Sequence, residues 1–244
     1  MAQERIHKII ADAGILSRRK AEEAIRQGRV TLNDQVVTKL GTKADPSKDL
    51  IRVDDQRVKL KTENQVILFH KPKNVITTRS DPEGRPTVYE YLPHFYRSLK
   101  SVGRLDFLSE GLLIFTNDGE LAYHLTHPRF KVEKKYLVKI KEPLDDKKIQ
   151  KLQRKIQLDD GPGKFKSITC TQLNNKTGVY EIVISEGRNR FIRRMIEALG
   201  HSVLKLKRTE MGPFKLDKLP PGKFEEIKKE RLLKIYKKIS LARE

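Results

Sequence analysis

The sequence predicts an α+β protein with a small N-terminal domain and a larger second domain. Two observations support this class. The first sixty residues hold two short helical patterns followed by a hairpin pattern, and strand patterns outnumber helical ones after residue 65. Consecutive strands there are separated by turn sequences, which favours a mixed or antiparallel sheet. We predict domains at residues 1–58 and 65–244, joined by the polar linker 59–64.

The small domain is predicted as two helices and a hairpin. In "RIHKIIADAG" the apolar residues recur at helical spacing, and Gly14 can end the helix. "SRRKAEEAIRQG" offers Ser17 as an N-cap and Gly28 as the stop of a second helix. "RVTLNDQVV" then places two short apolar segments around a turn at Asn33–Asp34.

The larger domain is predicted mainly as strands. "QVILFHKP" is an apolar strand ended by its proline, and "GLLIFTNDGELAYHLTHP" predicts a strand buried on both faces, a turn and a short helix. "KKYLVKIK" and "GVYEIVISEG" alternate as half-buried strands do. "RFIRRMIEALG" predicts a helix with Arg193 on its outward face, and Cys170 is expected as a small buried strand residue. The tail 223–244 predicts a charged helix whose apolar stripe is Ile227, Leu232, Ile235 and Ile239.

The charge balance favours a polyanionic partner. Lys and Arg number 52 against 32 Asp and Glu, a net charge of +20. Nucleic acid is a better candidate than membrane headgroups, because no lipidation motif or strongly amphipathic terminal helix is present. Three cations, Arg18, Arg19 and Lys20, fill the first turn of the second helix, where they oppose the helix dipole. Phosphate contact explains that placement, and so does a solvated basic face.

Several classes of protein are excluded by missing patterns. No apolar run is long enough to cross a bilayer, and "MAQERIHKII" lacks a signal-peptide core, so we expect a cytoplasmic protein without membrane contact. The single cysteine leaves no disulfide framework and no cysteine zinc site. Phosphate-loop, dinucleotide-binding and serine-hydrolase motifs are missing, and His124 and His127 have no second metal-ligating pair. We therefore expect no metal and no cofactor, and any reaction must rely on side chains alone.

Asp106 is the strongest candidate for a reactive group. In "GRLDFLSEGLLIF" it stands between Leu105 and Phe107, directly before the buried strand. Burial raises the pKa of a carboxyl group, whereas a neighbouring guanidinium lowers it and keeps the nucleophilic form. The segment "EGRNRFIRR" supplies candidate guanidinium partners. Such a pair suits covalent catalysis, and a purely structural ion pair between loop and helix is the alternative.

Two resemblances bear on these alternatives. "ADAGILSRRKAEEAIRQGRVTLNDQVV" resembles an S4 domain, a small module that binds structured RNA. "GRLDFLSEGLLIFTNDG" is similar to the signature of pseudouridine synthases, more narrowly of the RsuA/RluB branch that modifies ribosomal RNA. "HKPKNVITTRSDPEGRPTVYEYLP", "EKKYLVKI", "EGRNRFIRRMIEALGH" and "LKRTEMGPFKLDKLPPGKF" resemble further segments of that branch, in its order. One departure is Asn74, where the branch usually has glycine.

The resemblance implies an isomerase that breaks the N-glycosidic bond of a uridine, turns the base over and rejoins it through C5. This reaction requires no redox carrier, metal or nucleotide energy. The resemblance implies that Asp106 is the nucleophile, that Tyr136 stacks on the base and assists removal of the C5 proton, and that Arg193 pairs with Asp106. From its pattern alone, Tyr136 is equally consistent with a core tyrosine that opens a strand. The predicted RNA-binding residues are Arg18, Arg19, Lys20, Arg104, Arg188 and Arg190.

Two other functions remain as alternatives. One is a non-catalytic, ribosome-associated S4 protein that binds RNA and in which Asp106 is only structural. The other is the same chemistry on another RNA, such as small-subunit ribosomal RNA or tRNA. "DPEGRPTV" and "DDGPGKFKSI" look more like the large-subunit group, so large-subunit ribosomal RNA is the predicted partner. The resemblance also favours a monomer.

Overall fold

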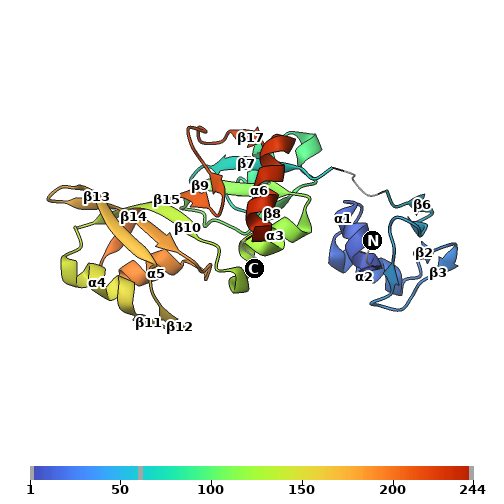
Figure 1. The fold of residues 1–244 in the computed structure, drawn as a ribbon, viewed down its shortest axis with the longest axis horizontal. Helices are drawn as coiled ribbons and strands as arrows, with labels where there is room; N and C mark the ends of the chain where they lie inside the picture. Colours follow the sequence, from blue (N-terminus) through green and yellow to red (C-terminus); the bar gives the residue numbers. More distant parts are fainter. Residues whose placement is uncertain (1–2, 60–62, 242–244) are drawn as a thin grey trace. The chain divides into compact units, whose positions relative to one another are not determined.

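The structure is a computed structural model that describes residues 3–59 and 63–241. The chain forms two compact units, one of residues up to Asn64 with Asn117–Gly119, the other of Gln65–Thr116 with the residues from Glu120 onward (Figure 1). Part of the predicted linker, residues 60–62, lies outside the described residues, as do residues 242–244 of the predicted C-terminal helix. Among the described residues, no helix has the length and apolar character needed to span a membrane.

The N-terminal unit packs two helices against a small sheet. Its helices are α1 (Ile6–Asp12) and α2 (Arg18–Arg26), and its antiparallel sheet has the order β3-β2-β5-β6. The strands are β1 (Glu4–Arg5), β2 (Val30–Leu32), β3 (Gln35–Val36), β4 (Lys43–Ala44), β5 (Ile51–Val53) and β6 (Gln56–Arg57), with β1 paired to β4. The apolar faces of both helices meet the sheet in one core.

Local sequence signals determine the boundaries in this unit. The Ser17 side chain caps α2 by accepting the backbone N–H of Lys20 at 3.3 Å. Asn33 and Asp34 both have positive φ, 51° and 66°, which a tight hairpin turn requires and which asparagine and aspartate tolerate better than most residues. The predicted helix–helix–hairpin arrangement is confirmed.

The second unit is built on a nine-stranded mixed sheet. The main strand order is β13-β14-β10-β15-β9-β7-β17, with β16 added beside β15 and β8 beside β9. Among the described strand pairs of this sheet, β15 and β9 are the parallel pair and the others are antiparallel. The strands are β7 (Val66–Lys71), β8 (Lys100–Val102), β9 (Glu110–Thr116), β10 (Lys134–Lys141), β13 (Ser167–Leu173), β14 (Thr177–Ile184), β15 (Ser202–Met211), β16 (Phe214–Lys215) and β17 (Phe224–Glu226). The predicted mixed sheet is confirmed.

Helices cover this sheet in two groups (Figure 1). The helices α4 (Asp146–Arg154) and α5 (Phe191–Glu197) pack on the half that contains β10, β14 and β15. The helices α3 (Gly119–Thr126) and α6 (Lys229–Leu241) share a core with β7 and β9. Short elements complete the unit: the 3₁₀ helices η1 (Val88–Tyr91), η2 (His94–Tyr96) and η3 (Pro128–Phe130) and the hairpin of β11 (Ile156–Leu158) and β12 (Gly161–Gly163).

Strand β9, which follows Asp106, is buried on both faces. Leu112 and Ile114 contribute to the core shared with α3 and α6, whereas Leu113 and Phe115 face the core that contains η1 and η2. The prediction of a doubly buried strand is therefore confirmed. A strand held from both sides is a rigid support for the loop that precedes it.

Two local predictions are wrong. Cys170 lies in a strand, β13, but is exposed, because β13 is an edge strand and only its first part faces the core. The C-terminal helix begins at Lys229 rather than at 223, because Phe224–Glu226 pair with β7 as strand β17. Ile227 is buried just before the helix, while Leu232, Ile235 and Ile239 form the expected stripe.

Candidate active site

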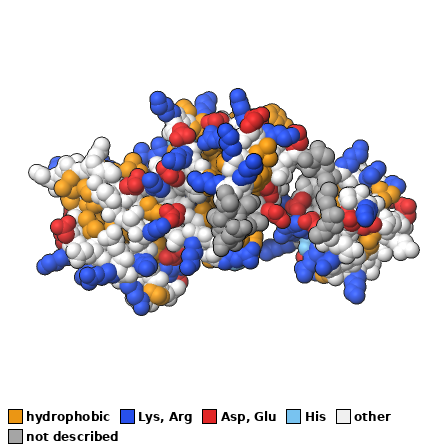
Figure 2. All heavy atoms as spheres, viewed as in Figure 1, with side chains coloured by type: hydrophobic (Ala, Val, Ile, Leu, Met, Phe, Trp, Pro, Cys, Tyr) orange, Lys and Arg blue, Asp and Glu red, His pale blue; other side chains and the backbone are white. Residues whose placement is uncertain are grey.

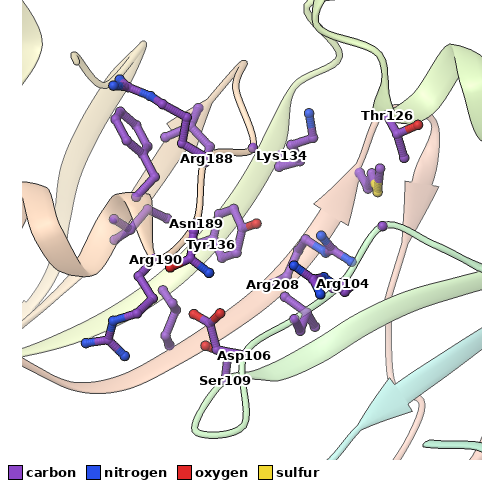
Figure 3. Close-up of a pocket in the computed structure, with 18 residues that line it drawn as sticks. Arg104, Asp106, Ser109, Thr126, Lys134, Tyr136, Arg188, Asn189, Arg190 and Arg208 are labelled. Atoms are coloured by element: carbon purple, nitrogen blue, oxygen red, sulfur yellow. The ribbon is translucent and has the colours of Figure 1, made fainter. Parts of the chain in front are cut away.

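Asp106 stands in a short loop between β8 and β9 and lines a cavity of about 300 Å³ (Figure 3). The loop turns tightly after it, with the Ser109 N–H donating to the Asp106 carbonyl at 3.0 Å. The preceding Leu105 is held at both backbone atoms by Thr77. The Thr77 hydroxyl donates to the Leu105 carbonyl at 2.9 Å and accepts its N–H at 3.3 Å. These contacts fix the backbone on both sides of the carboxylate.

A buried lysine at the end of β7 donates hydrogen bonds to the same loop. Lys71, the last residue of β7, is 0% exposed and donates to the carbonyls of Ser109 at 2.7 Å and Pro72 at 3.0 Å. Burial lowers the pKa of Lys71 to about 8, and the negative charges of Asp106 and Glu110 oppose that shift. Lys71 was not among the predicted site residues, although a lysine at the end of a mainly apolar strand is a visible signal.

The backbone conformation of Asn74 explains why asparagine can replace the glycine that the family usually has at this position. Its φ is +61°, a left-handed conformation that glycine adopts freely and asparagine more readily than most other residues. In that conformation its N–H donates to the Phe107 carbonyl at 2.8 Å. Asparagine therefore fits the position and keeps a backbone contact to the Asp106 loop.

Arg193 supports the loop from α5, but not as predicted. It is 5% exposed rather than outward, and it donates to the carbonyls of Val203 at 3.2 Å and Leu108 at 3.3 Å. A long contact of 3.5 Å joins it to the Ser109 hydroxyl. Between these two described side chains the expected ion pair is absent: no nitrogen of Arg193 lies within 4 Å of an Asp106 carboxylate oxygen. The guanidinium donates to backbone carbonyls instead. Helical spacing in the sequence does not reveal this choice of acceptor.

The charge of Asp106 still acts on Arg193. Burial lowers the pKa of Arg193, and the neighbouring Arg190 acts in the same direction, whereas Asp106 and Glu197 raise it. The two groups are therefore close enough to interact through space without a direct bond.

Tyr136 forms the wall of the cavity opposite Asp106. It lies on β10, paired across to Ile182 of β14 and to Arg208 of β15, and is 8% exposed. Figure 3 shows its ring and hydroxyl projecting into the cavity, with the Asp106 carboxylate facing it across the open space. The ring of a tyrosine in this position offers a flat surface and a titratable hydroxyl to whatever occupies the cavity.

The rest of the cavity wall is strongly cationic. Among the described residues that line it, Asp106 is the sole acid, and the basic residues are Arg104, Lys134, Arg188, Arg190 and Arg208. Arg188 is held by Glu186 and by Asp160, the latter at 2.9 Å. Arg104 and Arg190 are exposed at the rim, and Arg190 caps α5 with a left-handed φ of 49°.

The structure thus brings together most of the predicted residues of the second unit. Asp106, Tyr136, Arg104, Arg188 and Arg190 share one cavity, and Arg193 contacts its loop from behind. The cations Arg18, Arg19 and Lys20 are exposed on the first turn of α2, in the other unit.

Two residues of the cavity wall, Lys134 and Arg208, were not predicted from the sequence. Lys134 lies on the same strand face as Tyr136 and Val138, and Arg208 on the same face as Leu206. Their place in the cavity wall depends on the pairing of β10 with β15, which the sequence pattern does not specify.

A cavity of this kind suits a nucleotide. Its volume lies at the lower end of small-ligand pockets, its cations match phosphate, and an aromatic ring faces a carboxylate across it. The carboxylate can act as a nucleophile on a group that the ring and the cations hold in place.

Comparison with known proteins gives two family matches. Residues 65–198 match the family described as RNA pseudouridylate synthase, and residues 4–51 match the S4 domain. The resemblances predicted from the motifs are therefore confirmed, in the predicted order. The cavity residues from Gly103 to Ile192 lie inside the first match, and so does Arg193 behind the loop.

Individual relatives are similar to this protein over nearly its whole chain. An Aquifex aeolicus protein named "Uncharacterized RNA pseudouridine synthase" is 40% identical, covering 99% of this chain and 97% of its own. Proteins named "Ribosomal large subunit pseudouridine synthase B" from Bacillus subtilis and Escherichia coli K12 are each 40% identical over 92% of this chain, covering 92% and 79% of their own. A crystal structure of a pseudouridylate synthase superposes with a TM-score of 0.66 at 29% identity, covering 95% of this chain and 99% of that one.

Proposed function

Because the chain belongs to the family of RNA pseudouridylate synthases, we propose that it converts a uridine of large-subunit ribosomal RNA to pseudouridine, with Asp106 as the nucleophile. The reaction class is isomerisation. Relatives at 40% identity that are named for the large ribosomal subunit support the choice of RNA. The observation that carries the proposal is the cavity in which Asp106, its sole acid among the described residues, faces Tyr136.

Atoms balance without any second reactant. The bond between C1′ and N1 of the uridine breaks, and a bond between C1′ and C5 forms. The Asp106 carboxylate bonds transiently to the nucleotide while the base turns over, and is released when C5 is joined. The proton on C5 leaves and N1 gains one, so the product is an isomer of the substrate.

Tyr136 holds the base and handles the C5 proton. Its ring lies on the cavity wall opposite Asp106, so a uracil placed between them stacks on the ring and presents one face to the carboxylate. Its hydroxyl projects into the same space, where it can accept or relay the proton that leaves C5.

The remaining residues position the loop and the RNA. Arg193 and Lys71 fix the backbone carbonyls that follow Asp106. The cations Arg104, Arg188 and Arg190 stand at the cavity, where phosphates of an extruded nucleotide pass. Extrusion of a base from its stack costs a few kcal/mol, which phosphate contacts made here and by Arg18, Arg19 and Lys20 of the S4 domain offset.

The decisive experiment compares Asp106→Asn with Asp217→Asn. Both replace a carboxylate by an amide of the same shape, but Asp217 is exposed and does not line the cavity. Pseudouridines are mapped by carbodiimide treatment and primer extension on ribosomal RNA from cells that lack the protein and carry each variant. Asp106→Asn should bind RNA and form no pseudouridine, while Asp217→Asn restores the modification. Pseudouridine formed by Asp106→Asn would refute the nucleophile.

The same experiment tests the other candidate functions. Mapping covers both ribosomal subunits, so a site lost from small-subunit RNA alone would refute the large-subunit assignment. If removal of the protein changes no pseudouridine in any RNA, the activity proposed here fails, and an S4-domain protein that only binds RNA explains the basic surface instead.

A further inference from the structure

Two deeply buried cations in the cavity wall have no acidic partner. Lys134 is 7% and Arg208 is 4% exposed, and they lie on the neighbouring strands β10 and β15. In the part of the chain that the structure describes, neither side chain forms an ion pair within 4 Å. Both line the cavity that holds Asp106. A buried cation without a counter-charge is costly, so this pair needs an explanation.

The guanidinium of Arg208 is anchored at one edge and unsatisfied at the other. Its Nε donates to the Leu112 carbonyl at 2.8 Å, which fixes the side chain against β9. Its Nη2 is buried and has no hydrogen-bond partner among the described residues. An orphaned N–H of this kind is destabilising in the free protein, because it has given up water without a replacement acceptor. Figure 3 shows the end of Arg208 at the cavity, beside Arg104.

Lys134 is likewise a buried cation without an acidic partner within 4 Å among the described residues. Burial lowers its pKa to about 8, the nearby Arg208 acts in the same direction, and Glu186 opposes both. The side chain lines the cavity and lies between Arg188 and Thr126 in the view of Figure 3. An anion placed there would meet the ammonium group and relieve its repulsion from the guanidinium.

We propose that Lys134 and Arg208 bind one of the two phosphodiesters that flank the target uridine. This inference rests on the proposed function, which supplies a nucleotide in the cavity. Arg208 and Lys134 lie on one side of the space between Asp106 and Tyr136 (Figure 3). A uracil that stacks there with its sugar directed to that side brings a flanking phosphate to both cations. The phosphate accepts an N–H of the Arg208 guanidinium at the cavity wall, and the Lys134 ammonium supplies a second, charge-assisted hydrogen bond.

It follows that Lys134 and Arg208 contact the phosphate only after the base has left its stack. Neither cation is exposed, so an RNA that stays on the outer surface cannot reach them. Their contact therefore contributes to holding the flipped nucleotide rather than to the first encounter with RNA.

The test uses RNA with one neutral linkage. A methylphosphonate replaces the phosphate on the 5′ side or the 3′ side of the target uridine, with a 2′-deoxy sugar beside it, and the reference RNA has the same deoxy sugar and an ordinary phosphate. Affinity for the full-length protein is measured at fixed salt. For wild type, one of the two neutral linkages should weaken binding about tenfold or more, the loss expected for a charge-assisted hydrogen bond. Unchanged affinity at both positions overturns the proposal.

Variants connect the effect to these side chains. Lys134→Met should weaken binding of the reference RNA to a similar extent and show no further loss with the neutral linkage. Lys139→Met removes an exposed lysine from the same strand and should keep both the affinity and the sensitivity. If Lys134→Met remains fully sensitive, the phosphate is held elsewhere and the proposal is wrong. Arg208→Lys, which keeps the charge but not the anchored fork, should show a partial loss, and thermal unfolding confirms that each variant is folded.

The proposed function is tested separately by pseudouridine formation on the unmodified RNA. Wild-type protein that forms no pseudouridine refutes the activity. Wild-type protein that forms it, yet binds both neutral linkages normally, refutes only the phosphate site.

Discussion

Gly111→Ala should destabilise the second unit by several kcal/mol, because the backbone at Gly111 of β9 lies too close to β15 for a side chain. A Cβ on Gly111 would lie 2.2 Å from the carbonyl oxygen and 2.6 Å from the nitrogen of Arg208. Ordinary contact begins at 3.4 Å, so the two strands would have to move apart by about 1 Å. Such a shift breaks the parallel pairing of Glu110 and Gly111 with Lys207 and Arg208.

The cost can be assembled from two contributions. Gly111 has a φ of +110°, which side-chain-bearing residues rarely adopt, and such strain costs about 1–3 kcal/mol. Weakening one or two hydrogen bonds, including the one from Arg208 to the Leu112 carbonyl, adds about 0.5–1.5 kcal/mol each. A total of about 1.5–6 kcal/mol corresponds to a fall of about 3–24 °C in the melting temperature of a unit of this size.

Thermal unfolding followed by circular dichroism checks this prediction. Gly119→Ala is the matched control, since an added Cβ there meets nothing within 4 Å and its φ is not positive. The control should melt within about 2 °C of wild type, the range of an ordinary surface substitution, roughly ±0.5 kcal/mol. If Gly111→Ala also melts in that range, the two strands accommodate a side chain at this position, and the reasoning is refuted.

Three further predictions concern the site and the RNA. Burial lowers the pKa of Lys71 from 10.5 to about 8, so between pH 8 and pH 10.5 the unfolded chain binds more protons than the folded one. The unfolding free energy of wild type relative to Lys71→Met should therefore rise as the pH is raised from 8 to 10.5. A difference in unfolding free energy that stays constant with pH contradicts this. Tyr136→Phe should bind substrate RNA nearly as well as wild type but turn it over more than about tenfold slower, while Tyr136→Leu also loses affinity; normal turnover by Tyr136→Phe removes the hydroxyl from the mechanism. Replacing Arg18, Arg19 and Lys20 by glutamine should lower RNA affinity and flatten its salt dependence by about 0.7–0.9 in logarithmic slope for each phosphate that is no longer neutralised; an unchanged slope excludes these residues from the RNA interface.

Local signals in the sequence predict much of the fold. Helix caps and turn residues such as Ser17, Asn33 and Asp34 act over a few residues, so their outcome does not depend on the rest of the chain. The double burial of β9 was visible in an uninterrupted apolar run. The exposed position of Cys170 was not, because strand alternation does not tell an edge strand from a central one.

The candidate site shows the same division. Asp106, Tyr136 and Arg193 could be selected from motifs, because each lies in a segment with a recognisable pattern. Lys134 and Arg208 could not, since they enter the cavity through the pairing of two strands that are distant in the sequence. The contact made by Arg193 also depended on tertiary structure: its guanidinium can reach a carboxylate or a carbonyl from the same helical position.

The hydrogen bonds of Lys71 and Arg193 to the loop affect the reactivity proposed for Asp106. Both cations donate to backbone carbonyls at Leu108 and Ser109, and among the described residues no hydrogen bond to the Asp106 carboxylate oxygens is formed. A carboxylate in a bidentate ion pair has its lone pairs committed to N–H donors and must break those bonds before it attacks. Here the loop is held through its backbone while positive charge remains nearby, so the carboxylate is positioned and its oxygens stay available for the proposed attack on a nucleotide. An arginine paired directly with Asp106 would also keep the carboxylate charged, but the proposed nucleophile would then have to break that pair before it attacks.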